Sequence, residues 1–245
     1  MCDSHIPFVG LHAHSTAGSP FDGLGFPSKH MDFAFENGST ALALTDHGNM
    51  NGLAYQVLHA KKMLEEGKTF KPIYGIEAYF IPSLMNWRNE YKDIQAEKEK
   101  AKKKGRRKKE EDVAAGILLE DEGLSRQNNK KLSRRNHIIL LAQNQVGLSN
   151  LFQLISKSFD KPSQTFYKYP RMDFDMFKQH NEGIIASSAC LGGIYAKDYW
   201  SNKEEGRDAI LKAMRETTVG MQEIFGDRWY AELQWNRIPE QHELN

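Results

Sequence analysis

Short apolar runs rich in β-branched and aromatic residues recur along the chain and alternate with longer amphipathic stretches. The runs predict strands at residues 8–12, 41–45, 72–76, 137–142, 183–187 and 229–233. Apolar residues spaced three to four apart predict helices at residues 26–37, 53–66, 147–159 and 204–225, and residues 238–245 are also helix-like. Strands that alternate with helices predict parallel strands with crossover helices, in an open doubly wound sheet or in a barrel.

Polar side chains that can bind metals follow several of the predicted strands. His12 and His14 end the first run, His47 follows the second, Glu77 ends the third and Cys190 follows the fifth. In a βα-barrel the C-terminal strand ends converge on one mouth, whereas an open sheet spreads them along a line. The sequence therefore favours an α/β barrel that forms one domain over residues 1–245.

The histidine pair at the end of the first run is the most specific of these signals. In an extended strand residues i and i+2 point to the same face, so His12 and His14 can close on one metal ion or on two adjacent ions. Asp22 and His137 complete the candidate set, although strand-end reasoning does not select His137, which begins its run. The remaining histidines are not expected to bind metal: His5, His30, His59, His180 and His242.

The residue types of this set limit the ions that it could hold. Imidazole, carboxylate and thiolate bind zinc, and imidazole with carboxylate also suits manganese or iron. Glu77 has two oxygens and can bridge two cations, and paired ions about 4 Å apart can support phosphoester cleavage. Two further residues each have two possible roles. Asp46 either orients a ligand or caps a turn, and Glu232 either approaches the site or lies on the surface. Cys190 could equally be a plain buried thiol.

Residues 86–136 interrupt the alternation with a charged insertion. The segment holds 16 Lys and Arg against 10 Asp and Glu, which leaves 17 basic and 22 acidic residues for the rest of the chain. The positive charge is therefore concentrated in one segment, and the body is mildly acidic. Either the insertion is a flexible, solvated hairpin or loop, or its basic arm contacts a phosphate backbone, in which case binding depends strongly on salt.

The sequence carries no sign of a membrane or secreted protein. No apolar run approaches the roughly 18 residues of a membrane helix, and residues 1–7 lack the basic and apolar regions of a secretory signal. The only cysteines are Cys2 and Cys190, so a disulfide framework is not expected. We expect a protein of the reducing cytoplasm.

Taken jointly, the motifs around these residues resemble the polymerase and histidinol phosphatase (PHP) domain family, and most closely its version at the N-terminus of the bacterial DNA polymerase III alpha subunit. The motifs are HAHS at 12–15, TDHG at 45–48, GIE at 75–77, HIILLAQ at 137–143 and ACLGG at 189–193. The resemblance runs from about residue 8 to the C-terminus, interrupted by the insertion. Cys190 stands where the polymerase version often has cysteine and stand-alone phosphatases tend to have histidine.

The resemblance implies a distorted seven-stranded βα-barrel with up to three divalent metal ions, zinc, manganese or magnesium, at its mouth. In this resemblance His12 and His14 bind the first ion, and Glu77 bridges the first ion to the second. His137 and Cys190 complete the second site. Asp22 and His47 hold the third ion. A metal-activated water, and no protein side chain, would be the nucleophile.

One part of the family pattern is missing. The family ends with an Asp-x-His pair on the last strand, and no such pair follows Leu233. The resemblance therefore implies a chain that is truncated before its seventh strand and lacks two ligands, so that the isolated chain could be unstable or inactive.

The function that the resemblance implies is that of the N-terminal domain of a replicative DNA polymerase, a metal-dependent phosphoesterase with 3′–5′ exonuclease proofreading as its role. The implied partners are a DNA primer-template, the remainder of the polymerase chain, a proofreading subunit and a sliding clamp. One alternative is a stand-alone phosphatase for a small phosphomonoester such as histidinol phosphate, against which the basic insertion and Cys190 count. The other is a non-catalytic metal domain that stabilises the polymerase and docks a partner.

Overall fold

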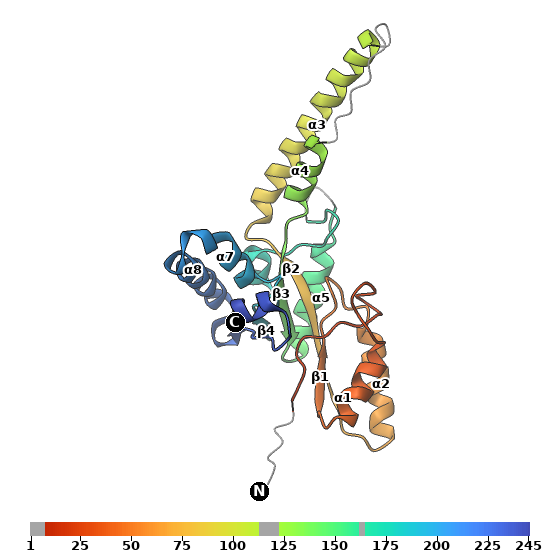
Figure 1. Cartoon of the computed structure of the whole chain (residues 1–245). Coiled ribbons are helices and arrows are strands. Elements are labelled where there is room, and N and C mark those ends of the chain that lie inside the picture. Colours follow the sequence, from red (N-terminus) through yellow and green to blue (C-terminus); the bar gives the residue numbers. More distant parts are fainter. Residues whose placement is uncertain (1–7, 113–122, 162–164) are drawn as a thin grey trace.

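The computed structural model describes residues 8–112, 123–161 and 165–245, and its centre is one sheet of five strands in the order β1-β2-β3-β4-β5 (Figure 1). The strands are β1 Ala41–Leu44, β2 Lys71–Phe80, β3 Asn136–Ala142, β4 Ile184–Ser187 and β5 Trp229–Tyr230. Five of the six predicted runs therefore contain strands. The run at residues 8–12 does not form a regular strand, and it lies beside β1 through a single bridge between Gly10 and Leu42.

One strand runs against the others. β2 is parallel to β1 and β5 is parallel to β4, but β3 is antiparallel to both β2 and β4. The prediction that all strands are parallel is therefore wrong at β3. Between β2 and β3 the chain forms α3 (Leu84–Asp112) and α4 (Gly123–Leu132), which project together from one end of the sheet (Figure 1). Because this connection returns to the end that it left, the next strand is antiparallel.

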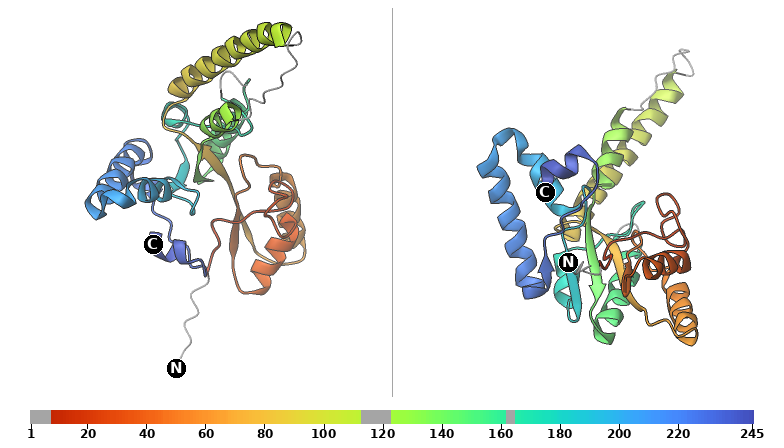
Figure 2. Two further views of the ribbon diagram at one scale, coloured as in Figure 1. Left: turned by 45° about the horizontal axis from the view of Figure 1, so that its top comes forward. Right: turned by 60° about the horizontal axis from the view of Figure 1, so that its bottom comes forward.

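The other helices are arranged around the strands. They are α1 Pro27–Glu36, α2 Leu53–Glu65, α5 Gln145–Ser158, α6 Phe174–Gln179, α7 Ile194–Asn202, α8 Arg207–Phe225 and α9 Pro239–Leu244. The four predicted helices correspond to α1, α2, α5 and α8, and the helix-like C-terminal residues to α9. Figure 2 shows α1 and α2 (red to orange) beside the β1 edge of the sheet and α7 and α8 (blue) beside the opposite edge. Among the described helices, none combines the length and the apolar character that crossing a bilayer requires.

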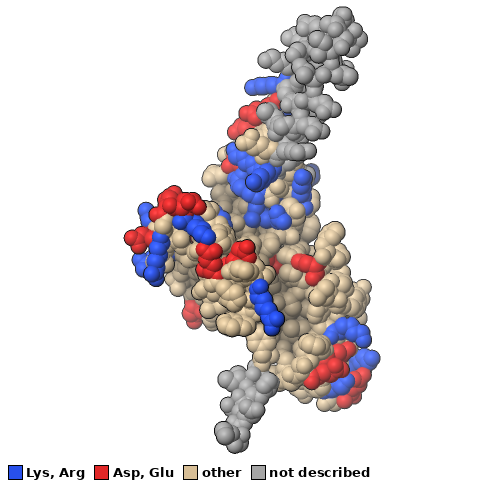
Figure 3. All heavy atoms as spheres, viewed as in Figure 1, with Lys and Arg blue, Asp and Glu red and all other residues tan. Residues whose placement is uncertain are grey.

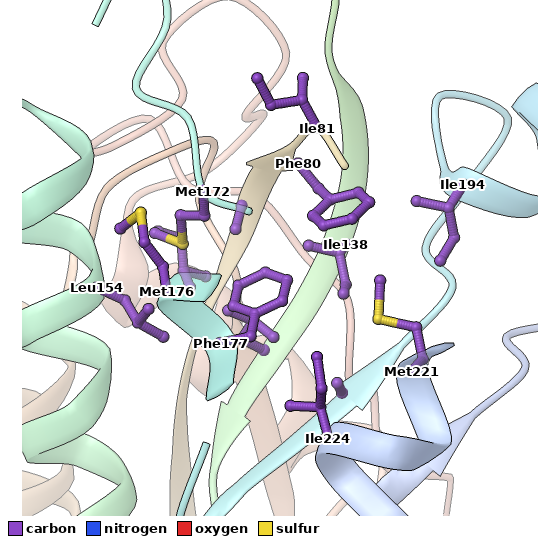
Figure 4. Close-up of a cluster of buried hydrophobic side chains, with 14 of the residues drawn as sticks. Phe80, Ile81, Ile138, Leu154, Met172, Met176, Phe177, Ile194, Met221 and Ile224 are labelled. Carbon is purple, nitrogen blue, oxygen red and sulfur yellow. The ribbon is translucent and has the colours of Figure 1, made fainter. Parts of the chain in front are cut away.

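Helices α1, α2, α5, α6, α7 and α8 contribute to the apolar clusters that cover one face of the sheet. The register pairs Ile76 of β2 with Leu140 of β3, and Leu140 with Ala186 of β4, so these three side chains share a face. All three belong to the main apolar cluster, in which Phe177 of α6 and Phe225 of α8 are also buried. Figure 4 shows side chains of α6 and α8 meeting those of β2 and β3 in this cluster.

The opposite face carries a small apolar cluster and then polar side chains. Ala43, Ile139, Leu141 and Ala189 form the cluster, and Glu77 shares their face because it pairs with Ile139. Helices that pack into the apolar clusters of one face are typical of a barrel, whereas a doubly wound sheet has such helices on both faces. Seven strands are not observed, since the described residues contribute five to the sheet.

The described parts of the charged insertion form α3 and α4, and the base of these helices belongs to the core. Trp87 and Ile94 of α3 and Leu132 of α4 are buried in the main cluster. The indole N–H of Trp87 donates to Leu132 O at 3.0 Å. The expectation of a solvated segment therefore does not extend to this base. The side chains of residues 101–112 and all of residues 113–122, which include much of the basic run, lie outside the described part of the structure.

Candidate metal centre

The predicted ligands meet at one edge of the sheet, on the face opposite the helices. The register aligns Glu77 of β2 with Ile139 of β3, and a bridge aligns His47 with Glu77. His137 pairs with Tyr79 of β2. Because β3 runs in the opposite direction, its first residues lie where the neighbouring strands end. This reversal explains why His137 begins its apolar run instead of ending it.

Glu77 is the centre of the cluster, and its side chain is fully buried. Its Oε2 lies 2.6 Å from His14 Nε2 and 3.1 Å from His12 Nε2. Its Oε1 lies 2.5 Å from His137 Nδ1 and 3.5 Å from Cys190 Sγ. One carboxylate therefore joins side chains from three segments that are far apart in the sequence.

A second set of contacts extends the cluster to Asp22. The Oδ2 atom of Asp22 lies 2.7 Å from His47 Nε2 and 3.1 Å from His14 Nδ1. Potential ligand atoms within 4.8 Å of one another form three overlapping groups. The first is His12, His14 and Glu77; the second is His47, Glu77 and His137; the third is His14, Asp22 and His47. Cys190 Sγ lies 3.5 Å from His137 Nδ1, beside the second group. All seven candidate ligands are thus in one place.

The carboxylates around His12 and His14 favour the protonated form of these two imidazoles in the metal-free cluster. At His12, burial opposes the charged form, but hydrogen bonds to Glu232 and Glu77 outweigh burial and raise the pKa to about 9. The pKa of His14 is raised in the same way, against burial, by its hydrogen bond to Glu77. At Glu77 itself burial favours the neutral acid, yet hydrogen bonds from the histidines hold the pKa well below its ordinary value. The pKa of His47 is lowered, chiefly by burial.

Cys190 is a free cysteine on a strained backbone; Cys2 lies outside the described residues. The preceding residue, Ala189, has a φ of 60°, a left-handed conformation that costs a non-glycine residue about 1 kcal/mol or more. Burial and the negative charge of Glu77 raise the pKa of the Cys190 thiol to about 12. The side chain is therefore a thiol in the metal-free chain, and a coordinating cation would remove its proton.

Glu232 contacts His12 on the side away from Glu77. His12 Nδ1 lies 2.6 Å from Glu232 Oε1, and the second oxygen of Glu232 accepts a hydrogen bond from Ser187 Oγ at 2.7 Å. Gln234 Nε2 donates to Glu232 Oε1 at 2.9 Å. Histidines that bind metals commonly donate their second ring N–H to a carboxylate, which fixes the tautomer. Of the two interpretations of Glu232, this geometry fits the one in which it approaches the site.

Asp46 lies outside the cluster and organises the loop that carries Asp22. Its buried carboxylate accepts hydrogen bonds from Ser15 N at 2.6 Å, Ser15 Oγ at 2.8 Å and Ser19 Oγ at 3.0 Å. Ser19 Oγ in turn accepts a hydrogen bond from His47 N at 2.9 Å. These bonds tie residues 15–22 to the end of β1, so that Asp22 faces His47.

Two glycines let the backbone pass close to the cluster. Gly48 has a φ of +68°, and a Cβ atom there would lie 2.8 Å from the ring of Pro170. A Cβ atom at Gly192 would lie 2.7 Å from His137 Nδ1. A side chain at Gly192 would therefore displace a candidate ligand.

The cluster has the chemistry of a divalent metal site. It offers imidazole nitrogens, carboxylate oxygens and one thiol, which are the donors that zinc and, without the thiol, manganese take from proteins. His47 Nδ1 is buried and, among the described residues, has no hydrogen-bond partner, although it lies 3.3 Å from Glu77 Oε2. A buried polar atom without a partner is costly, and a cation at this position would satisfy it. The residues present therefore fit divalent metal ions.

The histidines that the sequence placed outside the site are absent from the three ligand groups of the described residues. His59 instead lies 2.6 Å from Asp32 Oδ1, and His180 Nε2 lies 2.7 Å from Lys157 Nζ. His5 lies outside the described residues.

Two residues at the site were not predicted. The ring of Tyr79 stacks on that of His47 with centroids 5.9 Å apart and planes 3° apart. Gln234 Nε2 lies 3.2 Å from His12 Nδ1. Tyr79 follows Glu77 by two positions and Gln234 follows Glu232 by two. The period of two in extended chain places such residues on one face, and this signal could have found both.

The chain is similar to a known protein family and to curated proteins over nearly its whole length. The profile of the family described as PHP domain matches residues 10–236. The DNA polymerase III subunit alpha of Aquifex aeolicus is 32% identical over 238 residues, which are 97% of this chain and 16% of that protein. The same subunit of Deinococcus radiodurans is 30% identical over 248 residues, 100% of this chain and 15% of that protein. The chain therefore spans about 15–16% of the length of these curated relatives.

A solved structure with a similar course of the chain is that of an amidohydrolase from Chromobacterium violaceum. It is 15% identical, with a TM-score of 0.35, over 91% of this chain and 84% of that one. A likeness of this size supports no inference about function.

Proposed function

The chain belongs to the PHP domain family, and from this premise we propose that it is the metal-dependent phosphoesterase domain of a DNA polymerase III alpha-type chain. The observation that carries the proposal is the buried carboxylate of Glu77, whose two oxygens contact four histidines and a cysteine. We propose the following ligands for two or three divalent ions: His12, His14, Asp22, His47, Glu77, His137 and Cys190.

Divalent ions would supply Lewis-acid stabilisation of a phosphoryl oxygen and lower the pKa of a water molecule. Zinc and manganese suit these donors, whereas magnesium prefers sites made of oxygen atoms alone. Among the residues themselves, Glu77 would supply negative charge to the bound cations. Glu232 accepts from His12 Nδ1 and so turns His12 Nε2 toward Glu77. The raised pKa of Cys190 argues against a thiolate nucleophile in the metal-free chain.

The proposed role is 3′–5′ exonuclease proofreading during DNA replication in the cytoplasm. It is supported by the match of the chain to DNA polymerase III alpha subunits. The proposed partners are a DNA primer-template, the rest of a polymerase chain, a proofreading subunit and a sliding clamp. We also propose that residues 1–245 act as one domain of the seven-stranded PHP type, with residues 86–136 as an insertion into it.

The experiment is hydrolysis of a 5′-labelled DNA primer on its template, with manganese or zinc added back to protein treated with a chelator. We expect metal-dependent shortening of the primer from its 3′ end. The variants His12→Ala and His14→Ala should lose roughly 100-fold or more, because loss of a ligand exceeds the 10–100-fold effect typical of an outer-shell partner. His242→Ala, at an exposed histidine of α9, is the control. Activity that survives both ligand substitutions would contradict the proposal.

Two further outcomes point to other functions. Faster release of phosphate from histidinol phosphate than of nucleotides from DNA would favour a small-molecule phosphatase. The ligand groups also join β2 and β3 to the segments around residues 12–22 and 47, so bound metal could serve mainly to stabilise the fold. Full metal content without hydrolysis of either substrate would favour that structural role.

A further inference from the structure

A cavity of about 570 Å³ lies where the α3–α4 insertion meets the body of the protein. We call it the Arg135 cavity. Its volume falls within the range of sites that hold small ligands or single building blocks of larger ones. Its lining includes the cationic side chains Lys130, Arg134, Arg135 and Lys197 and the carboxylate of Glu90. Figure 3 shows Lys and Arg gathered on the surface at the base of the insertion.

Two of the four cations already have acidic partners. Arg134 donates through both terminal nitrogens to Glu90, at 2.6 and 2.9 Å, and Lys197 Nζ lies 3.1 Å from Asp198 Oδ1. In the described part of the chain, Arg135 has no carboxylate within 4.0 Å, and its Nε is buried without a hydrogen-bond partner. The cavity therefore keeps excess positive charge and an unused donor at Arg135.

A third guanidinium adds to the positive potential behind the cavity. Arg171 is fully buried and donates to the backbone oxygens of Leu132, Arg134 and Tyr167 instead of to a carboxylate. Its pKa is lowered to about 10, first by burial and then by the positive charges of Arg135 and Arg134. Cations that repel one another in this way attract an anion strongly.

Arg135 connects the cavity to the metal centre. Its guanidinium carbon lies 3.6 Å from the ring centroid of Tyr169 and 5.1 Å from that of Tyr79. The ring of Tyr79 lies 5.4 Å from that of His137 and is stacked on His47. A guanidinium stacked on aromatic rings keeps its in-plane N–H donors for bidentate contact with a phosphate. Basic groups interleaved with aromatic rings are typical of sites for single-stranded nucleic acid.

We propose that the Arg135 cavity binds the phosphate backbone of a single-stranded nucleic acid whose end lies in the metal centre. Arg135 and Lys130 are the phosphate contacts, and Tyr79 and Tyr169 line the path between the two places. The inference rests on the proposed function, since it names the substrate as a polynucleotide strand and not a small phosphomonoester. It also assigns a role to the base of the insertion, which contributes no proposed metal ligand.

The test measures binding in a metal chelator, so that no hydrolysis can occur. The fluorescence anisotropy of a labelled oligothymidylate is followed for the 245-residue chain over a range of salt concentrations. We expect Arg135→Ala and Lys130→Ala each to weaken binding roughly threefold to tenfold and to reduce the slope of log K against log salt by about 0.7. Arg215→Ala removes the same charge from an exposed position on α8 and should change neither quantity. The Tm of each variant, measured in the same buffer, checks that the effect does not come from unfolding.

Three results would overturn the proposal. The first is an unchanged affinity and slope in both cavity variants. The second is equal binding of a methylphosphonate oligonucleotide, which has no backbone charge. The third is an equal loss of polyglutamate binding in the cavity variants, which would indicate a surface for acidic proteins. Manganese-dependent hydrolysis of bis-p-nitrophenyl phosphate by the unchanged chain reports the proposed function separately, so the failure of one can be told from the failure of the other.

Discussion

At the scale of single residues, Glu77 decides the chemistry of the site. It is a fully buried carboxylate that stays ionised because imidazoles surround it. The carboxylate of Glu232 lies on the other side of the His12 ring and, among the proposed ligands, contacts His12 alone. Substitutions of Glu77 and Glu232 are therefore expected to have different effects on metal binding.

Replacement of Glu232 should weaken metal binding without removing it. Glu232→Gln keeps the size of the side chain but loses the charge that accepts the His12 N–H, so we expect zinc or manganese affinity to fall about 10–100-fold. Isothermal titration of the metal-free chain measures this. Glu66→Gln, at an exposed carboxylate beside Lys68, is the matched control and should be neutral. Equal affinities of the two variants would show that Glu232 does not support the site.

The raised pKa of His12 predicts how the stability of the metal-free chain depends on pH. A histidine with a pKa of 6.5 in the unfolded chain and about 9 in the folded chain stabilises fully below pH 6.5 and loses this contribution as pH rises through 9. The contribution is about 3 kcal/mol at most. The Tm gap between the chain and His12→Gln, measured in a chelator, should be largest at pH 6 and nearly closed at pH 9.5. A gap that widens with pH would contradict the assignment.

At the scale of elements, strand positions could be predicted from the sequence more readily than strand directions. The apolar runs located β1 to β5, and the spacing of apolar residues located α1, α2, α5 and α8. The reversal of β3 could not be read from periodicity, because it follows from how the helices of the insertion pack. For the same reason, geometry gave no ground for selecting His137, and only the family motif did.

The candidate site shows a similar division. Ligand-type residues at strand ends were visible in the sequence, and the structure brings them to one place. The contact between Glu232 and His12 spans 220 positions and depends on how β5 lies beside β4. The cationic contacts of Arg135 with Tyr169 and Tyr79 are likewise long-range. Local patterns do not contain such pairings.

Arg171 is predicted to fasten the insertion to the body. It is fully buried, and its guanidinium satisfies backbone oxygens at the end of α4 and in residues 167–169. Arg171→Met should cost about 3 kcal/mol or more, because several buried carbonyl groups lose their partner. Arg207→Met, at an exposed residue of α8, should stay within about 0.5 kcal/mol. Urea unfolding of both variants tests this, and equal losses would refute the role of Arg171.

At the scale of the whole molecule, the proposed ligands couple distant parts of the chain. They extend from His12 to Cys190 and bring together the N-terminal segment, β2, β3 and the loop after β4. Because the unfolded chain cannot assemble such a site, metal binding must stabilise the fold as a whole. Metal at 100 times its Kd should add about 2.7 kcal/mol, seen as a rise in Tm. Unchanged Tm over a wide range of zinc and manganese concentrations would contradict this coupling.

The most direct test of the account is the metal content of the chain. The metal-free protein is reconstituted with zinc or manganese and passed through a desalting column, and the bound metal is measured by mass spectrometry alongside Glu77→Gln and Glu66→Gln. The account predicts two to three ions per chain for the unchanged protein and for Glu66→Gln, and fewer than one for a folded Glu77→Gln. Metal content that is the same in Glu77→Gln, or absent from the unchanged protein, would contradict it.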